Sequence, residues 1–282
     1  MSALIVTSNE KPEILQHNLD SFLNQKITDL IIVSPHSLPF FQNKVRLIKD
    51  HNKGKPTALN IVFKKVKSDI LILTDGDVRL ADNAVENLLK KFNDTVGAVS
   101  GKPIPINSKK NLFGYWAHLL TEVGAHRERL FRTNRNEFVP CSGYLYAIRN
   151  IIEKIPENSL SDDAIISYKI WQKGYKIEYA PDAVVYVKYP NNWKDWVKQK
   201  RRSTAGYVQF KKLLGVKSES RNILREMSRG TMVTLKYAKS IKELAWSFAL
   251  LFARLFIWIL AYWDLFNKKQ FKDIWLPVES TK

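Results

Sequence analysis

The first hundred residues alternate between short apolar runs and stretches with helical periodicity. Apolar runs at residues 4–7, 30–33, 45–48, 70–74 and 96–100 predict strands. The segments between them predict helices over residues 9–24, 56–65 and 83–92. This alternation predicts an α/β fold with a mostly parallel, Rossmann-like sheet and flanking helices.

After residue 100 the pattern becomes less regular. Residues 109–135 predict a helix followed by a polar, arginine-rich loop, and residues 139–147 predict a small-residue turn that runs into an aromatic strand. A helix over residues 161–174 and strands at 176–179 and 184–187 follow. We therefore expect a catalytic domain over residues 1–190 and a helical, membrane-associating region over residues 191–282.

The strand at residues 70–74 ends in two carboxylates, Asp75 and Asp77, separated by one glycine. In open α/β sheets the ligand crevice lies beyond the carboxyl ends of the strands, so both acids are expected where a ligand can reach them. Hard cations such as Mg²⁺ and Mn²⁺ prefer oxygen ligands, and Mg²⁺ typically takes one or two carboxylates together with substrate phosphates. An ordinary Asp-Gly turn is the alternative interpretation.

Further polar groups are expected at the same edge of the sheet. Right-handed crossovers bring the ends of the first and fourth strands to one rim. The first strand ends at Thr7, with Asn9 and Glu10 after it, and Lys53 and Gly54 open a helix. A helix N-terminus beside lysines suits a phosphate-bearing ligand. The glycine-rich motifs of dinucleotide dehydrogenases and P-loop NTPases are absent from the sequence, which leaves a nucleotide held with a metal.

Two later segments are candidates for acceptor chemistry. Cys141, Ser142 and Gly143 would form a pocket wall where a ligand approaches the backbone, and a plain turn is the alternative. Asp162 and Asp163 stand in the first turn of a predicted helix, where the helix dipole favours the ionised form of an acid. Either they serve only the helix, or one of them is a general base beside an acceptor hydroxyl.

The formal net charge of +18 is concentrated in the second half of the chain, where basic residues alternate with aromatic ones. Nucleic acid, anionic lipid and phosphorylated small molecules all attract such a protein. A nucleic-acid-binding module leaves the acids at the rim unexplained, because carboxylates repel phosphate unless a metal intervenes. We expect no nucleic-acid partner. The single cysteine and a strand-like N-terminus without a signal peptide favour a cytoplasmic location.

Two C-terminal segments favour a membrane surface. Residues 193–214 predict an amphipathic basic helix, with a solvated face as the alternative to a membrane interface. Residues 245–263 are apolar except for Ser247 and Arg254, and are near the ~20 residues of a bilayer crossing. Arg254 would cost about 2.5–3.5 kcal/mol at the bilayer centre. We favour a helix in the membrane plane or in a homo-oligomer over a true span, with burial in the protein's own core as a third option.

Taken in order, these motifs resemble those of the inverting family-two glycosyltransferases, which have the GT-A fold. The resemblance covers about residues 3–205 and rests on several motifs in family-like order. They are residues 7–10 (Thr-Ser-Asn-Glu), 53–60 (Lys-Gly-Lys-Pro-Thr-Ala-Leu-Asn), 75–77 (Asp-Gly-Asp), 141–143 (Cys-Ser-Gly), 161–163 (Ser-Asp-Asp) and 199–202 (Gln-Lys-Arg-Arg). The last resembles the Gln-x-x-Arg-Trp motif of membrane-bound members such as hyaluronan, chitin and cellulose synthases.

The resemblance implies a donor site for a nucleotide sugar and a cofactor, Mg²⁺ or Mn²⁺. Asp77 is implied as the metal ligand on the diphosphate, with Asp75 beside it holding the ribose or the donor sugar. The other residues implied at the donor are Thr7, Asn9, Glu10, Lys53, Gly54, Gln199 and Arg202. Residues 34–36 (Ser-Pro-His) depart from the acid often found there, so the base stays open, and UDP is our expectation.

The resemblance also implies the acceptor side and the course of the reaction. Asp163 is implied as the general base in a single displacement. Arg202 is implied to stabilise the negative charge that develops on the leaving group. The residues implied to line the acceptor site are Cys141, Ser142, Gly143 and Asp162. Ser203 replaces the tryptophan of the Gln-x-x-Arg-Trp motif, which weakens the expectation of a processive synthase. We expect a lipid or glycan acceptor at the cytoplasmic face of the membrane. A nucleotidyltransferase of similar topology is the alternative.

Overall fold

The computed structural model describes residues 1–38, 45–214, 234–267 and 278–281. They form two compact units, each composed of several segments. The first comprises Met1–Ile104, Arg132–Asn158 and Asp162–Val187, and the second comprises Pro105–Phe131, Ser159–Ser161 and Lys188–Lys282. The second unit thus takes two segments from within the first 190 residues. The units are described separately below.

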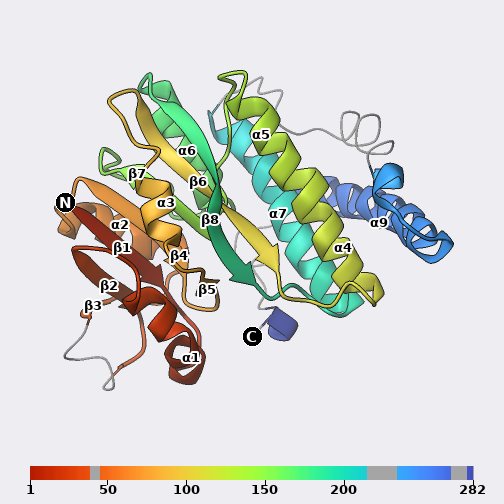
Figure 1. The fold of residues 1–282 in the computed structure, drawn as a ribbon, viewed down its shortest axis with the longest axis horizontal. Coiled ribbons are helices and arrows are strands. Elements are labelled where there is room, and N and C mark those ends of the chain that lie inside the picture. Colours follow the sequence, from red (N-terminus) through yellow and green to blue (C-terminus); the bar gives the residue numbers. More distant parts are fainter. Residues whose placement is uncertain (39–44, 215–233, 268–277, 282) are drawn as a thin grey trace. The chain divides into compact units, whose positions relative to one another are not determined.

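The first unit is built on an eight-stranded sheet with the order β3-β2-β1-β4-β7-β6-β8-β5 (Figure 1). The strands are β1 (Ser2–Thr7), β2 (Asp29–Ser34), β3 (Arg46–Lys49), β4 (Ile70–Asp75), β5 (Arg79–Leu80), β6 (Val96–Pro105), β7 (Leu145–Arg149) and β8 (Lys176–Val187). The two strands expected at residues 176–179 and 184–187 are therefore one continuous strand.

The sheet is mixed, with parallel pairing confined to one half, and the expectation that it is mostly parallel is wrong in this respect. β3 pairs with β2, β2 with β1 and β1 with β4 in parallel, whereas β7 runs antiparallel to both β4 and β6. β1, β2 and β4 have continuous apolar runs because both of their faces are covered. The register places Thr7 directly beside Asp75, so the two strands end at the same edge of the sheet.

Four helices of the first unit flank this sheet (Figure 1). They are α1 (Pro12–Leu23), α2 (Lys55–Lys65), α3 (Ala84–Leu89) and α6 (Asp162–Gln172). Pro12 begins α1, where the missing N–H would have no helical partner anyway. Gly54, with φ of 92°, turns the chain into α2. The α/β architecture with flanking helices agrees with the expected fold class.

The second unit is mainly helical. Its elements among the described residues are α4 (Leu112–Thr121), the π-helix η2 (Glu122–Arg127), α5 (Glu128–Thr133), which runs on into the first unit, α7 (Trp193–Leu214), α9 (Ile241–Phe266) and the short η3 (Glu279–Thr281). The arginine-rich loop expected after α4 is wrong, because η2 and α5 continue the helix to Thr133. His118 of α4 has a structural contact, between its Nε2 and the Asn107 carbonyl at 2.8 Å.

An aromatic core holds α4, α7 and α9 together. Tyr115, Trp116, Leu119, Trp196, Leu250, Ala253 and Ile257 form its buried cluster. Trp116 donates a hydrogen bond from Nε1 to the Trp246 carbonyl at 2.7 Å, and the hydroxyls of Tyr115 and Ser247 lie 2.8 Å apart. These bonds satisfy the polar ends of large aromatic side chains that would be costly to bury unpaired. One side of the apolar C-terminal helix is thus part of a protein core.

Candidate active site

Thr7 and Asp75 meet at the carboxyl ends of neighbouring strands. Thr7 donates from Oγ1 to the Thr74 carbonyl at 3.2 Å and lies 3.3 Å from Asp75 Oδ1. Gly76 follows at a very close approach, because a Cβ there would stand 2.6 Å from Ser8 Cβ. Gly76 also donates its N–H to the Thr7 carbonyl at 3.0 Å. The glycine of the Asp-Gly-Asp turn therefore lets β4 end against β1 and fixes Asp75 at the rim.

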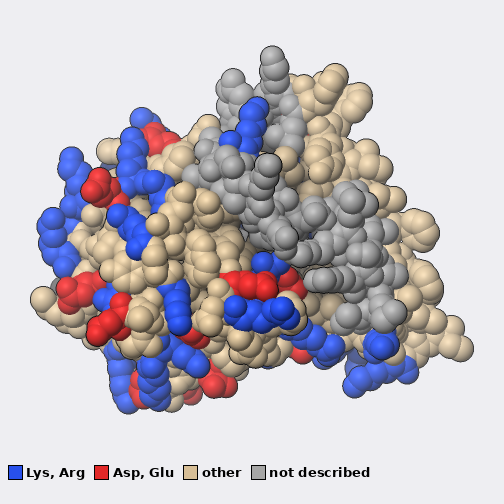
Figure 2. Space-filling view, turned by 90° about the horizontal axis from the view of Figure 1, so that it is seen from above, with Lys and Arg blue, Asp and Glu red and all other residues tan. Residues whose placement is uncertain are grey.

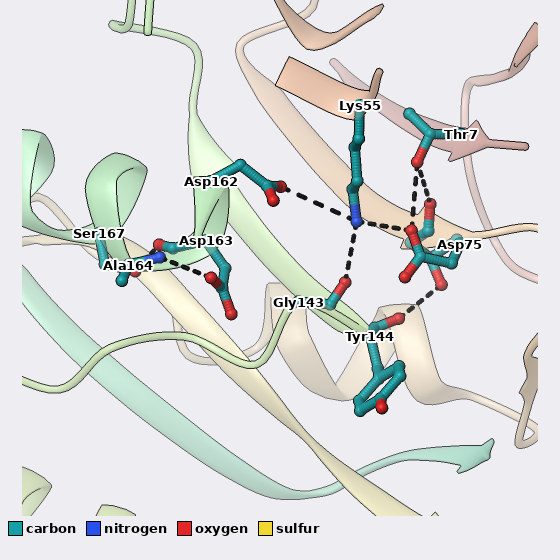
Figure 3. A network of polar contacts seen from close by, with 10 residues as sticks. Thr7, Lys55, Asp75, Gly143, Tyr144, Asp162, Asp163, Ala164 and Ser167 are labelled. Carbon is teal, nitrogen blue, oxygen red and sulfur yellow. Dashed lines mark hydrogen bonds and ion pairs between the residues drawn. The ribbon is translucent and has the colours of Figure 1, made fainter. Parts of the chain in front are cut away.

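Lys55 links this rim to the acids of α6 (Figure 3). Its ammonium donates to Asp75 Oδ1 at 2.5 Å and to the Gly143 carbonyl at 3.3 Å, and lies 3.9 Å from Asp162 Oδ2. Burial alone would lower the pKa of Lys55, but the charges of Asp75 and Asp162 outweigh it and raise that pKa above its ordinary value. One buried cation thus stands between two carboxylates from distant parts of the sequence.

Asp163 lies beside the same loop. Its Oδ1 accepts a hydrogen bond from Ala164 N at 2.8 Å, and its backbone carbonyl accepts from Ser167 Oγ at 2.6 Å (Figure 3). A Cβ on Gly143 would stand 3.2 Å from Asp163 Oδ2, so the missing side chain leaves this carboxylate close to the loop. Lys55 contacts the carbonyl of the same glycine. Gly143 is therefore the point where the lysine and the acids of α6 come together.

Asp77 lies in unusual electrostatic surroundings. Burial, together with the nearby negative charges of Asp75 and Glu10, raises its pKa to about 7. A divalent cation would relieve this repulsion, so the residues present fit the expected Mg²⁺ or Mn²⁺. No group of three or more His, Cys, Asp or Glu side chains among the described residues is arranged to hold a metal. A cation at Asp77 and Asp75 would therefore need oxygen ligands from a substrate, as Mg²⁺ sites commonly have.

The remaining predicted site residues are placed differently. Cys141 and Ser142 are buried, and their N–H groups donate to Ser167 Oγ at 3.0 Å and Ser100 Oγ at 2.9 Å. These two hydrogen bonds fix the backbone of the loop that contains Gly143. Asn9 and Lys53 are exposed. Gln199 and Arg202 belong to α7 in the second unit, so their roles at the donor stay predictions.

Sequence reasoning missed two residues of this site. Lys55 supplies the ammonium group, whereas the predicted donor residue was its exposed neighbour Lys53. Tyr146 of β7 carries a buried hydroxyl that has no hydrogen-bond partner within the described part of the chain. Burial and the charges of Asp162 and Asp163 raise the pKa of Tyr146 well above its ordinary value. The aromatic character of this strand does not indicate in the sequence that the Tyr146 hydroxyl lies near Asp162 and Asp163.

The mixed sheet with flanking helices is the GT-A glycosyltransferase fold. The family model described as Glycosyltransferase like family 2 matches residues 2–206, and the chain belongs to this family. The probable glycosyltransferase YdaM of Bacillus subtilis is 28% identical over 237 residues, which are 75% of this chain and 56% of that protein. The predicted family is thereby confirmed.

Two further relatives match about half of the chain. The O-antigen chain rhamnosyltransferase RfbN of Salmonella typhimurium is 31% identical over 149 residues (49% of this chain, 46% of that protein). The hyaluronan synthase of Streptococcus pyogenes is 28% identical over 170 residues (53% of this chain, 40% of that protein). The chain thus spans about half the length of the curated relatives it matches.

Two solved structures share the fold at low sequence identity. The mannosyltransferase PcManGT from Pyrobaculum calidifontis, in complex with GDP-Man and Mn²⁺, has a TM-score of 0.66 and 18% identity over 95% of this chain and 87% of that chain. GalNAc-T7 with UDP, GalNAc and Mn²⁺ has a TM-score of 0.54 and 18% identity over 87% of this chain and 53% of that chain. Both are consistent with the expected Mg²⁺ or Mn²⁺ cofactor.

Proposed function

We propose that this enzyme transfers a sugar from a nucleotide-diphosphate sugar to an acceptor hydroxyl with inversion at the anomeric carbon, and that Asp163 is the general base. The observation that carries the proposal is the convergence of Asp163, Asp162, Lys55 and Asp75 around Gly143. Because Gly143 has no side chain, the carboxylate of Asp163 is open on the side of this loop. A carboxylate in that position can accept the proton of an acceptor hydroxyl that attacks the donor sugar.

The donor side is formed by the ends of β1 and β4 and the start of α2. Asp77, with Asp75 beside it, would hold Mg²⁺ or Mn²⁺, which supplies positive charge against the diphosphate leaving group. Lys55 orients Asp75 and adds a second positive charge within the site. Thr7 donates a second hydrogen bond to the same Asp75 oxygen, Oδ1. Further donor contacts are proposed for Asn9, Glu10, Lys53, Gly54, Gln199 and Arg202.

The proposed nucleotide is UDP, with GDP as the alternative. The names of the two structural neighbours include both, one with GDP-Man and one with UDP. The residues that replace the family's usual nucleoside-contacting acid, Ser34, Pro35 and His36, do not favour either base by charge.

The proposed acceptor is a membrane lipid or a glycan carried on one, at the cytoplasmic face of the membrane. The support is the strongly basic second half of the chain and the apolar C-terminal helix. The acceptor would approach along the loop at residues 141–143, with Gly143 and Asp162 on the site side and Cys141 and Ser142 behind them. Residues 1–190 would carry the catalysis and residues 191–282 the membrane attachment.

Asp163→Asn tests the base assignment, because the amide keeps the size of the side chain but cannot take a proton. We expect donor binding to be retained, measured as thermal stabilisation by UDP or GDP with Mn²⁺. We expect transfer, measured as nucleoside diphosphate release from nucleotide sugars with extracted membrane lipids, to fall at least about 100-fold. Asp162→Asn is the matched control and should lose less. Transfer by Asp163→Asn at the wild-type rate would remove Asp163 from this role, and retention of the anomeric configuration in the product would contradict inversion.

A further inference from the structure

Helix α9 has two apolar sides, and within the described part of the chain only one of them is packed against other elements. Among the described residues of α9, the buried side chains are Ser247, Leu250, Ala253, Arg254, Ile257, Trp258, Ala261 and Asp264. The exposed large apolar side chains are Ile241, Leu244, Phe248, Phe252, Leu255, Phe256, Ile259, Tyr262, Trp263 and Phe266. We call this second set the outer face of α9. Phe252, near its middle, is 71% exposed.

The outer face is a single continuous stripe. At 3.6 residues per turn its ten members fall within an arc of about 120°, and the buried set is centred on the opposite side of the helix. From Leu244 to Phe266 no charged residue interrupts the stripe. Figure 2 shows mainly uncharged surface at the upper right of the view, and α9 lies at the right in Figure 1, from which Figure 2 is turned about the horizontal axis. Soluble monomers rarely expose an apolar patch of this extent unless it contacts a partner.

The packed side of α9 argues against a membrane crossing. The helix is long and apolar enough to cross by length and composition, from Ile241 to Asp264. However, it packs against α7, and Arg201 of α7 forms a two-bond ion pair with Asp264 of α9. Arg254 is 3% exposed, on the packed side. A crossing α9 would take the strongly basic α7 into the hydrocarbon, where charged side chains are costly.

The outer face could contact either a lipid surface or a second copy of the chain, and the charge of the neighbouring residues favours the lipid surface. The described residues 188–214 and 234–242, which lead into α9, contain eleven lysines and arginines and only one acidic residue. Two copies joined through their outer faces would bring two such basic segments together, which repel. An anionic lipid surface attracts them, and contributes about 1 kcal/mol per nearby lysine or arginine.

We propose that the outer face of α9 lies in the plane of an anionic bilayer, at the boundary between headgroups and acyl chains. The aromatic side chains Phe252, Tyr262 and Trp263 enter this boundary, where aromatic residues are favoured. Arg254 and Asp264 stay on the side that faces α4 and α7. This inference deepens the membrane attachment proposed above for residues 191–282, and it needs no donor, acceptor or catalytic base, so its test is separate from that of Asp163.

Vesicle sedimentation with the full chain tests the surface. The double variant Phe252→Ser/Ile259→Ser removes two outer-face side chains, and Leu47→Ser/Ile106→Ser removes two exposed apolar side chains elsewhere. On phosphatidylcholine–phosphatidylglycerol vesicles we expect the first variant to bind at least about ten-fold more weakly than wild type, and the second to bind within about two-fold. Pure phosphatidylcholine should bind the wild type weakly. Equal loss in both variants, or no preference for the anionic vesicles, would overturn the proposal.

Depth measurements separate an in-plane helix from a spanning one. The only native cysteine, Cys141, is buried, so a polarity-sensitive dye can be attached selectively at Leu244→Cys, Phe252→Cys or Trp263→Cys. An in-plane α9 places all three dyes at the same shallow depth, as measured by quenchers at known positions along the lipid chain. A deep central dye between two shallow ones would overturn the proposal. So would a lipid-free dimer that Phe252→Ser/Ile259→Ser converts to monomer while vesicle binding stays unchanged.

Discussion

Substitution of Lys55 by glutamine removes the only ammonium group that the described structure places between the carboxylates of Asp75 and Asp162. The change keeps the approximate length of the side chain but leaves both acids without their shared cation. We expect a clear loss of stability in the metal-free enzyme. The loss should be fully present at pH 7, because the pKa of Lys55 lies above its ordinary value of 10.5 and the ion pair breaks only at still higher pH.

The magnitude follows from the contacts. A hydrogen bond to a charged group contributes about 1.5–3 kcal/mol. Lys55 is largely buried but Asp75 is partly exposed, which places its 2.5 Å bond at the lower end of that range. The Asp162 contact at 3.9 Å adds less. The free energy of unfolding should therefore fall by about 2 kcal/mol, which corresponds to a decrease in Tm of about 3–4 °C for a chain of this size.

Lys53→Gln is the matched control, since Lys53 is an exposed lysine two residues away. Its expected effect on the free energy of unfolding is within about 0.5 kcal/mol. Thermal unfolding of both variants, followed by circular dichroism in EDTA at pH 7, measures the difference. If Lys55→Gln and Lys53→Gln unfold at the same temperature, the ion pairs around Lys55 do not hold the site together and this reasoning is refuted.

Three further predictions concern neighbouring groups. The pKa of the Asp77 carboxyl rises from 3.8 to about 7 on folding. Between about pH 4 and about pH 7 this carboxyl therefore holds its proton in the folded state but loses it in the unfolded state. The Tm of the metal-free enzyme should therefore fall as pH increases from about 4 to about 7, and this fall should be smaller in Asp77→Asn; identical pH profiles would contradict the burial of that charge. Gly76→Ala forces a Cβ to within 2.6 Å of Ser8 and should cost at least about 2 kcal/mol in urea unfolding, whereas Gly124→Ala, with nothing within 4 Å, should be neutral or stabilising. Tyr146→Phe removes a buried hydroxyl without a partner in the described structure, so its Tm should equal or exceed that of the wild type; a lower Tm would reveal a partner.

The sequence predicted the strands that are buried on both faces better than the rest of the sheet. Residues 70–74 form a continuous apolar run, and β4 occupies Ile70–Asp75. β7 has the same local character, yet it runs antiparallel to β4. The direction of a strand depends on the path of the chain that precedes it. Before β7 the chain passes through helical segments of the second unit, and the periodicity of apolar residues cannot predict such a path.

The helices show a similar limit. The apolar periodicity of the helix ends at Val123, so the arginine-rich residues after it predict a loop. Arginine, glutamate and leucine nevertheless have good helix propensity, and the helix continues through η2 and α5 to Thr133. In α9 the mean hydropathy is high because both sides of the helix are apolar, so an average over the window cannot distinguish the packed side from the outer face.

At the site, residue type was easier to predict than side-chain direction. The acids of 75–77 and 162–163 were found because carboxylates at strand ends and helix starts suggest chemistry. Lys55, by contrast, differs from Lys53 only in being the first residue of α2, after the positive φ of Gly54 has turned the chain. Nothing in the sequence alone indicates which of the two lysines reaches Asp75.

The central claim is that a cation at Asp77 joins the enzyme to the diphosphate of a sugar donor. Calorimetric titration of UDP and GDP into the wild type, Asp77→Asn and Asp163→Asn, each with Mn²⁺ and with EDTA, tests it directly. We predict that one nucleotide binds the wild type and Asp163→Asn at least about ten-fold more tightly with Mn²⁺, and that Asp77→Asn loses this difference. Binding that is equally tight in EDTA and unaffected by Asp77→Asn would contradict the claim.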